Sequence, residues 1–148
     1  MLGIEVPPRA LYLRTIFAEL QRLASHLLWL GTFGMDLGGA LGGGASLFMY
    51  CFRERETIIG LFEEVNGCRF HYNTHAVGGN RHDITPKFNQ DTKATLEVIE
   101  KRLEEYVQIF SSNKIYRDRT QGIGVLAGDL AEKLKHQIDD SKFFDSPK

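Results

Sequence analysis

The stretch PPRALYLRTIFAELQRLASHLLWL, residues 7–30, decides the fold of this chain. Proline is tolerated in the first turn of a helix, where N–H groups have no partner, so Pro7 and Pro8 mark a helix start. Apolar side chains then recur at steps of three and four residues, the period of an amphipathic helix. They are Leu13, Ile16, Phe17, Leu20, Leu23, Ala24, Leu27 and Leu28. We expect this first helix to reach residues 34–38.

Five glycines within residues 38–44 follow, and they interrupt the helix because glycine is a poor helix former. A flexible interhelix loop is the favoured interpretation, since the run lacks the spacing of a nucleotide-binding loop and follows a helix. One alternative is that backbone N–H groups at the start of the second helix meet an anion or a partner's surface. Ser46 is the expected N-cap of that helix, and Asn66-Gly67 its expected end.

The rest of the chain also favours helices. Thr85 followed by Pro86 predicts the N-cap and first residue of a third helix, whose apolar residues continue to Phe110. We expect short helices over residues 115–120 and 129–138, with a loop between them. The predicted fold class is therefore all-α: three longer helices plus short C-terminal helices, with an irregular polar loop between helices two and three. We expect one helical domain over residues 1–126, then a short charged helix and a frayed tail over 127–148.

Composition excludes several classes of function. The chain of 148 residues is 43% hydrophobic with a net charge of −1, which is typical of a globular protein and offers nucleic acid no basic surface. Cys51 and Cys68 lie far apart with no C-x-x-C pair, so the chain lacks a zinc ribbon and a cysteine-ligated iron–sulfur cluster of its own. No stretch approaches the roughly 20 apolar residues of a transmembrane helix.

The window CRFHYNTHAVGGNRHD, residues 68–83, is the densest in groups that titrate or bind metals. It holds His71, His75 and His82. The spacing of the first two would suit metal ligands on a helix, but the asparagine and glycines around them argue against a helix. A zinc site is therefore disfavoured, and the residues alone indicate a polar loop of unassigned purpose.

Asp36 is a candidate functional carboxylate. It lies at the C-terminal end of the first helix, where the macrodipole disfavours negative charge by a few tenths to about 1 kcal/mol. The residues alone favour a plainer interpretation, a solvated carboxylate beyond the helix end.

The second helix contains a charged segment, FRERE, at residues 52–56. Periodicity puts Arg55 on the apolar stripe of this helix and the other three charged residues on a solvated face.

Several motifs, in order along the chain, carry a resemblance to a known family. They are EVPPRALYLRTIFAELQRLASHLLWLG, DLG, FRERETIIGLFEEVNGCRFHYN, VGGNRHD and RLEEYVQIFSSNKIYRDRTQGIGVL. From Gly3 to Leu126 they closely resemble the quinone-facing core subunit of bacterial NADH:quinone oxidoreductase, which is respiratory complex I. This family is related to the large subunit of nickel–iron hydrogenases.

The resemblance implies a part in quinone reduction within a proton-translocating NADH:quinone oxidoreductase. Family members form the quinone pocket with an iron–sulfur small subunit, which holds the terminal [4Fe–4S] cluster, and NADH is oxidised elsewhere in the complex. The chain would then bind no cofactor directly and take quinone as substrate. Its partners would be the small subunit and other peripheral-arm and membrane-arm subunits, with a peripheral location at the cytoplasmic face of the cell membrane.

Three residues take roles from the resemblance. Asp36 matches the family aspartate that supports a histidine at the quinone headgroup. His71 matches the family histidine that lies against the terminal cluster and titrates with its redox state, and Arg81 is expected to help shape the same face. The polar loop would thus face a partner's cluster instead of holding a metal.

The chain departs from the family pattern in its length, its glycine run and its continuation after residue 126. The family chain is much longer, so the resemblance implies an internal fragment that is inactive alone. Two alternatives remain open. One is a fragment of the large subunit of a related membrane-bound hydrogenase or F420H2 dehydrogenase, and the other is a helical binding module without a redox role.

Overall fold

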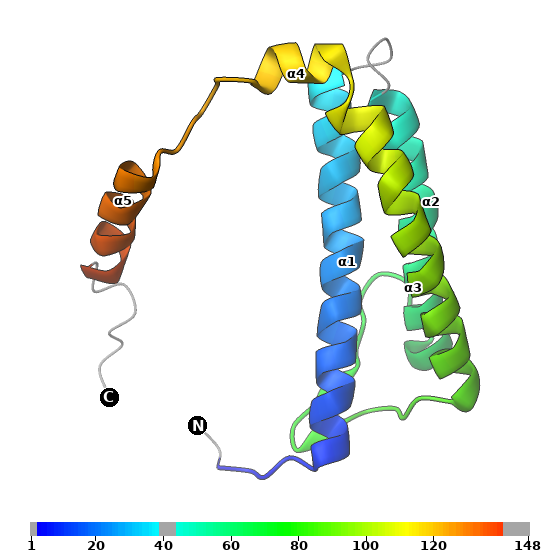
Figure 1. Ribbon diagram of the computed structural model, residues 1–148. Helices are drawn as coiled ribbons and strands as arrows, with labels where there is room; N and C mark the ends of the chain where they lie inside the picture. The colour runs from blue at the N-terminus through cyan, green and yellow to red at the C-terminus, as the bar shows by residue number, and fades with distance from the viewer. Residues whose placement is uncertain (1–2, 39–43, 141–148) are drawn as a thin grey trace. The chain divides into compact units, whose positions relative to one another are not determined.

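A computed structural model, which describes residues 3–38 and 44–140, confirms a mostly helical chain. Three long helices form a bundle (Figure 1). The polar loop between the second and third helices contains a two-stranded antiparallel hairpin. The elements are α1 (Pro8–Gly38), α2 (Gly44–Asn66), β1 (His75–Ala76), β2 (Gly79–Asn80), α3 (Pro86–Tyr106), a π-helical turn (Val107–Ser111), α4 (Lys114–Thr120) and α5 (Gly128–Asp140). The short helices predicted near residues 115–120 and 129–138 are therefore confirmed.

Helices α1 and α2 form an antiparallel pair, and the spacing of their buried residues explains the pairing. In both helices the buried positions step alternately by four and three residues, as in helices that cross at a small angle. The α1 set is Leu13, Phe17, Leu20, Ala24, Leu27, Gly31 and Gly34, and the α2 set includes Leu47, Cys51, Glu54, Ile58 and Leu61. One continuous seam, apolar apart from Glu54, therefore joins the two helices.

Two glycines of α1 allow the close approach of α2. A Cβ atom on Gly34 would lie 2.9 Å from Leu47 Cδ2, and one on Gly31 would lie 3.3 Å from both Phe48 Cα and Cys51 Cβ. Real Cβ atoms are not found at the first of these distances. Gly31 and Gly34 are therefore packing residues within α1 and do not interrupt the helix.

Some residues of the predicted apolar stripes are exposed. Leu28 of α1 is 39% exposed, and Leu96 and Leu103 of α3 are 40% and 49% exposed. Burial is confined to part of each helix, and these three side chains lie outside the buried set. The residues that α3 and the π-helical turn bury are Phe88, Ile99, Tyr106 and Phe110.

The predicted start of the second helix was wrong. Ser46 is exposed and lies inside α2, which begins at Gly44. A Cβ atom on Gly38 would lie 3.4 Å from the Gly44 nitrogen, so the end of α1 packs directly on the first residue of α2. This contact extends the helix to a glycine that sequence preference alone would leave in a loop. Residues 39–43 of the glycine run lie outside the described residues.

The start of α3 matches the prediction. The Thr85 hydroxyl accepts a hydrogen bond of 3.0 Å from the Phe88 amide, and Pro86 occupies the first helical position. A side chain that accepts from the third residue of the helix satisfies one of the N–H groups that have no helical partner. This cap sets where the polar loop ends.

A π-helical turn follows α3 and aims an aromatic side chain into the bundle. The Ser112 amide donates to the Val107 carbonyl at 3.3 Å, the wider hydrogen bond of a π-helix. Phe110, within this turn, then contacts Phe33 of α1 at 5.9 Å and Tyr116 of α4 at 4.0 Å between ring centroids. Aromatic contacts thus join the C-terminal ends of α1 and α3.

Contacts divide the chain into two compact units, Met1–Arg117 and Asp118–Lys148. The first contains the bundle and the polar loop, and the second contains α5. A domain boundary at residue 126 stays a prediction. Of the tail predicted to fray, residues 141–148 lie outside the described residues. Over the part of the chain that the structure describes, no helix combines the length and apolar character needed to cross a bilayer.

Candidate functional site

The polar loop runs between two well-defined helix ends. Gly67 ends α2 with a φ of 68°, and its amide donates to the Glu63 carbonyl at 2.8 Å. A left-handed residue after a helix is the ordinary way to satisfy its last carbonyl groups. Thr85 caps α3 at the other end. The loop is therefore anchored at both ends by local hydrogen bonds that its own sequence supplies.

Inside the loop, β1 and β2 form a short hairpin that sequence reasoning missed. Ala76 pairs with Gly79, and the Arg81 amide donates to the Thr74 carbonyl at 2.9 Å. Gly78 has a φ of 81°, the value that a type II turn requires at its second central residue. The Val-Gly-Gly sequence was the signal, but strands of two residues show no period.

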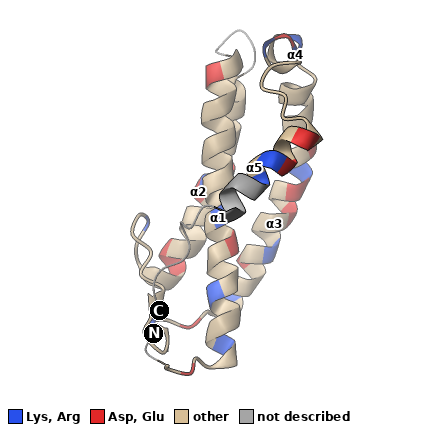
Figure 2. Cartoon of the chain, turned by 90° about the vertical axis from the view of Figure 1, so that its left-hand side faces the viewer, with Lys and Arg blue, Asp and Glu red and all other residues tan. Residues whose placement is uncertain are grey.

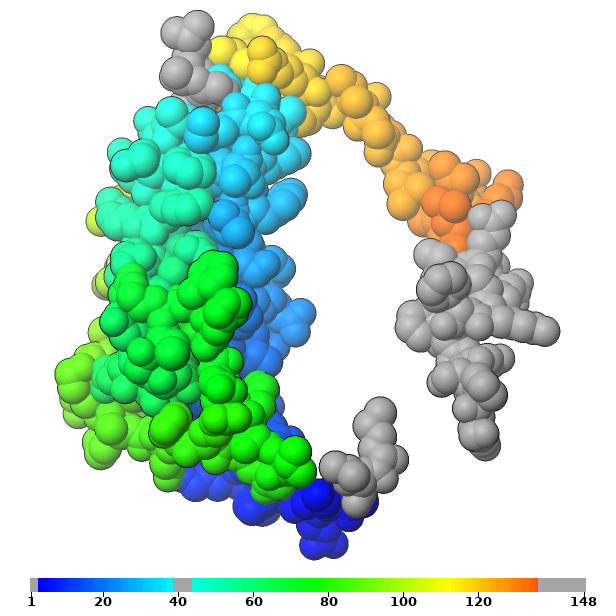
Figure 3. Space-filling view, turned by 180° about the vertical axis from the view of Figure 1, so that it is seen from behind, coloured from blue at the N-terminus to red at the C-terminus, as the bar shows by residue number. Residues whose placement is uncertain are grey.

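One arginine of α1 holds this hairpin. The Nη2 group of Arg14 donates to the Ala76 carbonyl at 2.8 Å and to the Gly79 carbonyl at 2.9 Å. These two residues face each other across the hairpin. A single guanidinium group therefore ties both strands to the helix. In the space-filling view, the loop region (green) covers part of α1 (blue) and of α2 (Figure 3).

Two further contacts flank the Arg14 clamp. The Asn80 side-chain amide donates to the Ala10 carbonyl at 3.5 Å, and Arg9 makes hydrogen bonds of 2.8 to 3.2 Å with both carboxylate oxygens of Asp83. The Arg9 hydrogen bond lowers the pKa of Asp83 and raises that of Arg9. Both side chains are exposed, so this ion pair adds little stability, although it connects the end of the loop to the first turn of α1.

The first half of the loop is held by an aromatic stack. The Tyr72 ring stacks on Phe62 of α2 at 4.0 Å and 17°, and the buried Phe62 in turn contacts Phe17 of α1. His71 precedes Tyr72 and is exposed, and its ring makes a T-shaped contact with Phe70 at 4.7 Å between centroids. Phe70 and Val77 are 81% and 76% exposed, so the outer face of the loop presents apolar side chains to its surroundings.

The structure brings two of the three predicted site residues to one loop and leaves the third apart. His71 and Arg81 are both exposed on the loop. Asp36 is also exposed, and it lies in the last turn of α1 instead of beyond the helix end. Between Arg14, which holds the loop, and Asp36 lie about 33 Å of helix at 1.5 Å per residue. Figure 1 shows the loop at one end of α1 and the C-terminal end of α1 at the other.

The donor atoms of this loop do not form a metal site. Among the described residues, no group of three or more His, Cys, Asp or Glu side chains converges. His75 lies in β1 and His71 in the irregular segment before it, so they do not share a helix face. Cys51 is buried and Cys68 exposed, and two cysteines cannot supply the four thiolates of a [4Fe–4S] cluster.

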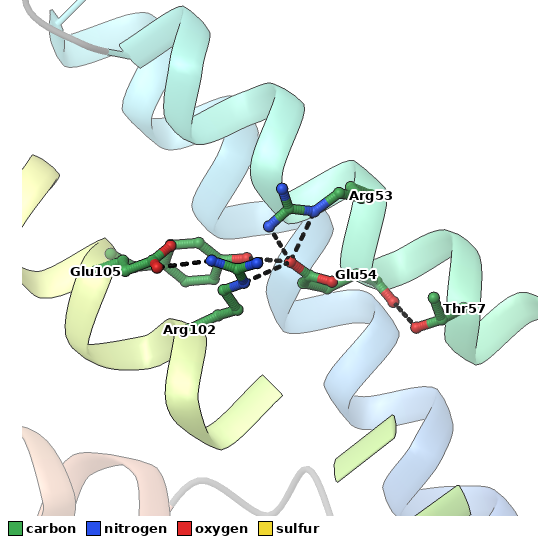
Figure 4. Close-up of polar contacts among 6 residues, drawn as sticks. Arg53, Glu54, Thr57, Arg102 and Glu105 are labelled. Atoms are coloured by element: carbon green, nitrogen blue, oxygen red, sulfur yellow. Dashed lines mark hydrogen bonds and ion pairs between the residues drawn. The ribbon is translucent and has the colours of Figure 1, made fainter. Parts of the chain in front are cut away.

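The structure also contains a buried polar cluster that the sequence did not reveal. The carboxylate of Glu54 accepts a hydrogen bond of 2.9 Å from Arg53 Nε and one of 3.2 Å from the Tyr106 hydroxyl (Figure 4). Arg102 Nε lies 3.9 Å from the same oxygen. Burial and the Glu54 charge raise the pKa of the Cys51 thiol to about 11 and raise the pKa of Tyr106 well above its usual value.

The prediction for the charged segment of α2 was therefore wrong at Glu54, which is 3% exposed instead of solvated. Arg55, predicted to be on the buried stripe, is partly exposed, and its guanidinium lies 5.8 Å from the centre of the Phe52 ring. Neighbouring residues on a helix point about 100° apart, so the orientation of α2 toward α1 decides which of them is covered. The alternating spacing from Leu47 to Leu61 was the signal that could have identified Glu54.

Comparison with known proteins identifies the family. Residues 42–136 match the family described as respiratory-chain NADH dehydrogenase, 49 Kd subunit. The chain belongs to this family. The resemblance found in the sequence is thereby confirmed, and the fold agrees with it. A chain from the membrane-bound sulfane sulfur reductase, an archaeal respiratory membrane complex, superimposes with a TM-score of 0.77 and 30% identity, covering 84% of this chain and 32% of that chain.

Curated relatives include components of complexes with different names. NADH-quinone oxidoreductase subunit 4 of Thermus thermophilus is 45% identical over 134 residues, covering 90% of this chain and 32% of that protein. A subunit of the F(420)H(2) dehydrogenase of Methanosarcina mazei is 42% identical over 134 residues, covering 90% of this chain and 34% of that protein. The chain therefore spans about a third of the length of the curated relatives that it matches.

Proposed function

We propose that this chain is part of the quinone-reducing subunit of a respiratory NADH:quinone oxidoreductase. In this proposal the polar loop faces the [4Fe–4S] cluster of an iron–sulfur partner subunit, and the Asp36 end of α1 borders the quinone site. The observation that carries the proposal is the loop itself. It is held to the bundle by Arg14 and by the Tyr72 stack, while His71 and Arg81 remain exposed on it.

The chemistry of the loop suits a neighbouring redox centre. Histidine is the side chain whose charge ordinarily changes between pH 5 and 8, and a cluster gains negative charge on reduction. A nearby reduced cluster would favour the protonated imidazole of His71, so reduction would draw in a proton. Arg81 has no carboxylate partner among the residues whose side chains are described. Its charge is therefore available to a partner.

The rest of the complex would supply the remaining chemistry. The iron–sulfur subunit would hold the cluster and would form the quinone site together with this chain. Other peripheral-arm and membrane-arm subunits would complete the complex, and NADH would be oxidised elsewhere in it. In this proposal the chain lies at the cytoplasmic face of the membrane, as a peripheral part of the complex. Because α1 separates Asp36 from the loop, the two would act on different parts of the process.

A tag on this chain provides the first test. We expect capture from mildly solubilised membranes to recover an iron–sulfur subunit and a cluster that electron paramagnetic resonance detects. The midpoint potential of that cluster should depend on pH, and His71→Ala should abolish the dependence while the matched variant His82→Ala, on the same loop, retains it. Unchanged pH dependence in His71→Ala would remove the proposed role of that histidine.

A second function rests on the 42% identity with a component of an F(420)H(2) dehydrogenase. The captured complex distinguishes these two functions by its electron donor. NADH should reduce the cluster of an NADH:quinone oxidoreductase, and F420H2 should reduce that of an F420H2 dehydrogenase. A chain captured alone, without a redox partner, would instead favour a helical binding module.

A further inference from the structure

The hydrogen bonds of Arg14 join parts of the chain that are far apart in the sequence. Its two acceptors, Ala76 and Gly79, lie 62 and 65 residues further along the chain. Arg14 is partly buried, and both bonds come from one terminal nitrogen. Carbonyl oxygens that accept from a guanidinium form charge-assisted hydrogen bonds, which are stronger than neutral ones.

The fixed hairpin leads directly to Arg81. Asn80 precedes it and contacts Ala10 of α1, the Arg81 amide itself donates to the buried Thr74, and Asp83 two residues later pairs with Arg9. The residues on both sides of Arg81 are therefore tied to α1 through their side chains. Arg81 itself is exposed.

We propose that Arg14 is a positioning residue, which fixes the place from which Arg81 presents its positive charge to the iron–sulfur partner. This inference rests on the function proposed above. A positive charge near a cluster favours the reduced state, because reduction adds a negative charge. Without Arg14 the hairpin would detach from α1, and the Arg81 side chain would occupy many positions. The mean effect of its charge on the potential of the cluster would then be weaker.

The test uses the tagged complex and compares the midpoint potential of the partner's cluster among variants. Arg81→Gln should lower the potential, and Arg14→Leu should lower it in the same direction. The midpoint potential in the double variant should be no lower than in Arg81→Gln alone, because both substitutions remove the same effect, that of the Arg81 charge on the cluster. Arg14→Lys, which keeps a charged donor, should recover part of the loss. Arg22→Leu is the matched control on α1, since the one partner of Arg22 among the described side chains is the exposed Glu19, and it should leave the potential unchanged.

Amide hydrogen exchange supplies an independent measurement on the same complexes. Exchange at the Arg81 amide should accelerate roughly tenfold or more in Arg14→Leu, since two charge-assisted hydrogen bonds are lost. If Arg14→Leu does not assemble, Arg14→Gln takes its place, because its shorter neutral side chain does not reach the hairpin.

The outcomes separate the two proposals. If Arg81→Gln leaves the potential unchanged, the loop does not act on the cluster through Arg81, and the proposed function loses that residue. If Arg81→Gln lowers the potential but the Arg14 variants do not, or if exchange at Arg81 stays slow in them, the positioning role of Arg14 is wrong while the function stands.

Discussion

The Tyr106 hydroxyl of α3 donates a hydrogen bond of 3.2 Å to the Glu54 carboxylate of α2 within the bundle. The Glu54 side chain is 4% exposed, whereas its partners Arg53 and Arg102 are 47% and 40% exposed. A buried carboxylate is thus neutralised by guanidinium groups that reach it from the surface. The cluster joins α2 to α3 just before the π-helical turn.

Glu54→Gln should lower the free energy of unfolding by about 1–3 kcal/mol. The arginines lose their charged partner, and a neutral amide is a weaker acceptor for the donors that surround it. Urea denaturation of the 148-residue chain, followed by circular dichroism, measures the change. Glu56→Gln is the matched control on the same helix. Glu56 is 62% exposed, so its variant should stay within about 0.5 kcal/mol of the parent. Equal effects at both positions would contradict the buried cluster.

Stability should fall at alkaline pH. The folded-state pKa values of Cys51 and Tyr106 are raised, so the folded chain holds protons that the unfolded chain releases above about pH 9. Their contribution is complete below that pH and is lost as pH rises through the folded values, by at most about 1.4 kcal/mol per pH unit for each group. Tyr106→Phe should give a shallower decline between about pH 9 and 11 in denaturation experiments, and an identical decline would exclude the tyrosine as a cause.

Gly34→Ala should destabilise the chain although alanine is the better helix former. The added methyl group would lie 2.9 Å from Leu47, which is fully buried, and such overpacking costs about 1–3 kcal/mol. Gly60→Ala in α2 is the control, because its methyl group would meet nothing within 4 Å. It should stabilise the chain by about 0.5–1 kcal/mol. Two stabilising substitutions would mean that α1 and α2 do not approach closely at Gly34.

Asp36→Asn should raise stability and lower function. Removing a negative charge from the last turn of α1 relieves repulsion by the helix macrodipole, worth about 0.3–1 kcal/mol in the isolated chain. If the carboxylate supports the quinone site as proposed, kcat/KM for quinone in the complex should fall roughly tenfold or more. The potential of the cluster should not change, because α1 separates Asp36 from the loop. Full activity with normal KM would remove Asp36 from the quinone site.

The isolated chain should associate through the uncharged part of α1. Residues 23–35 contain no Lys, Arg, Asp or Glu, and Figure 2 shows this part of the helix without charged residues. Leu28, Trp29 and Met35 are exposed there. Apolar patches of this kind mark contact surfaces. The emission of Trp29, the single tryptophan, should shift to shorter wavelength as protein concentration rises.

Substitution within and outside this surface tests the association. Leu28→Lys should weaken the concentration-dependent shift, because a charge would be buried in the contact. Met49→Lys should not, since Met49 is 65% exposed on α2. A chain whose Trp29 emission is independent of concentration would favour the free-standing helical module over a segment of a larger subunit.

The fold class and the family follow from the sequence itself. The apolar period of residues 7–30 predicts α1, and Thr85-Pro86 predicts the start of α3, because both signals depend only on neighbouring residues. The motifs that carry the family resemblance are likewise local, and the match over residues 42–136 confirms it. Interactions between neighbouring residues are therefore sufficient to predict features that depend on only a few turns of helix.

Tertiary structure alone decided which polar residues matter. Glu54 is buried and Arg55 only partly so, because the orientation of α2 toward α1 selects between neighbours on the helix. Arg14 holds a hairpin more than sixty residues away, and a hydrogen bond to a backbone carbonyl leaves no mark on the sequence of its acceptor. The separation of Asp36 from His71 likewise follows from the straight length of α1, since the helix puts its two ends about 45 Å apart.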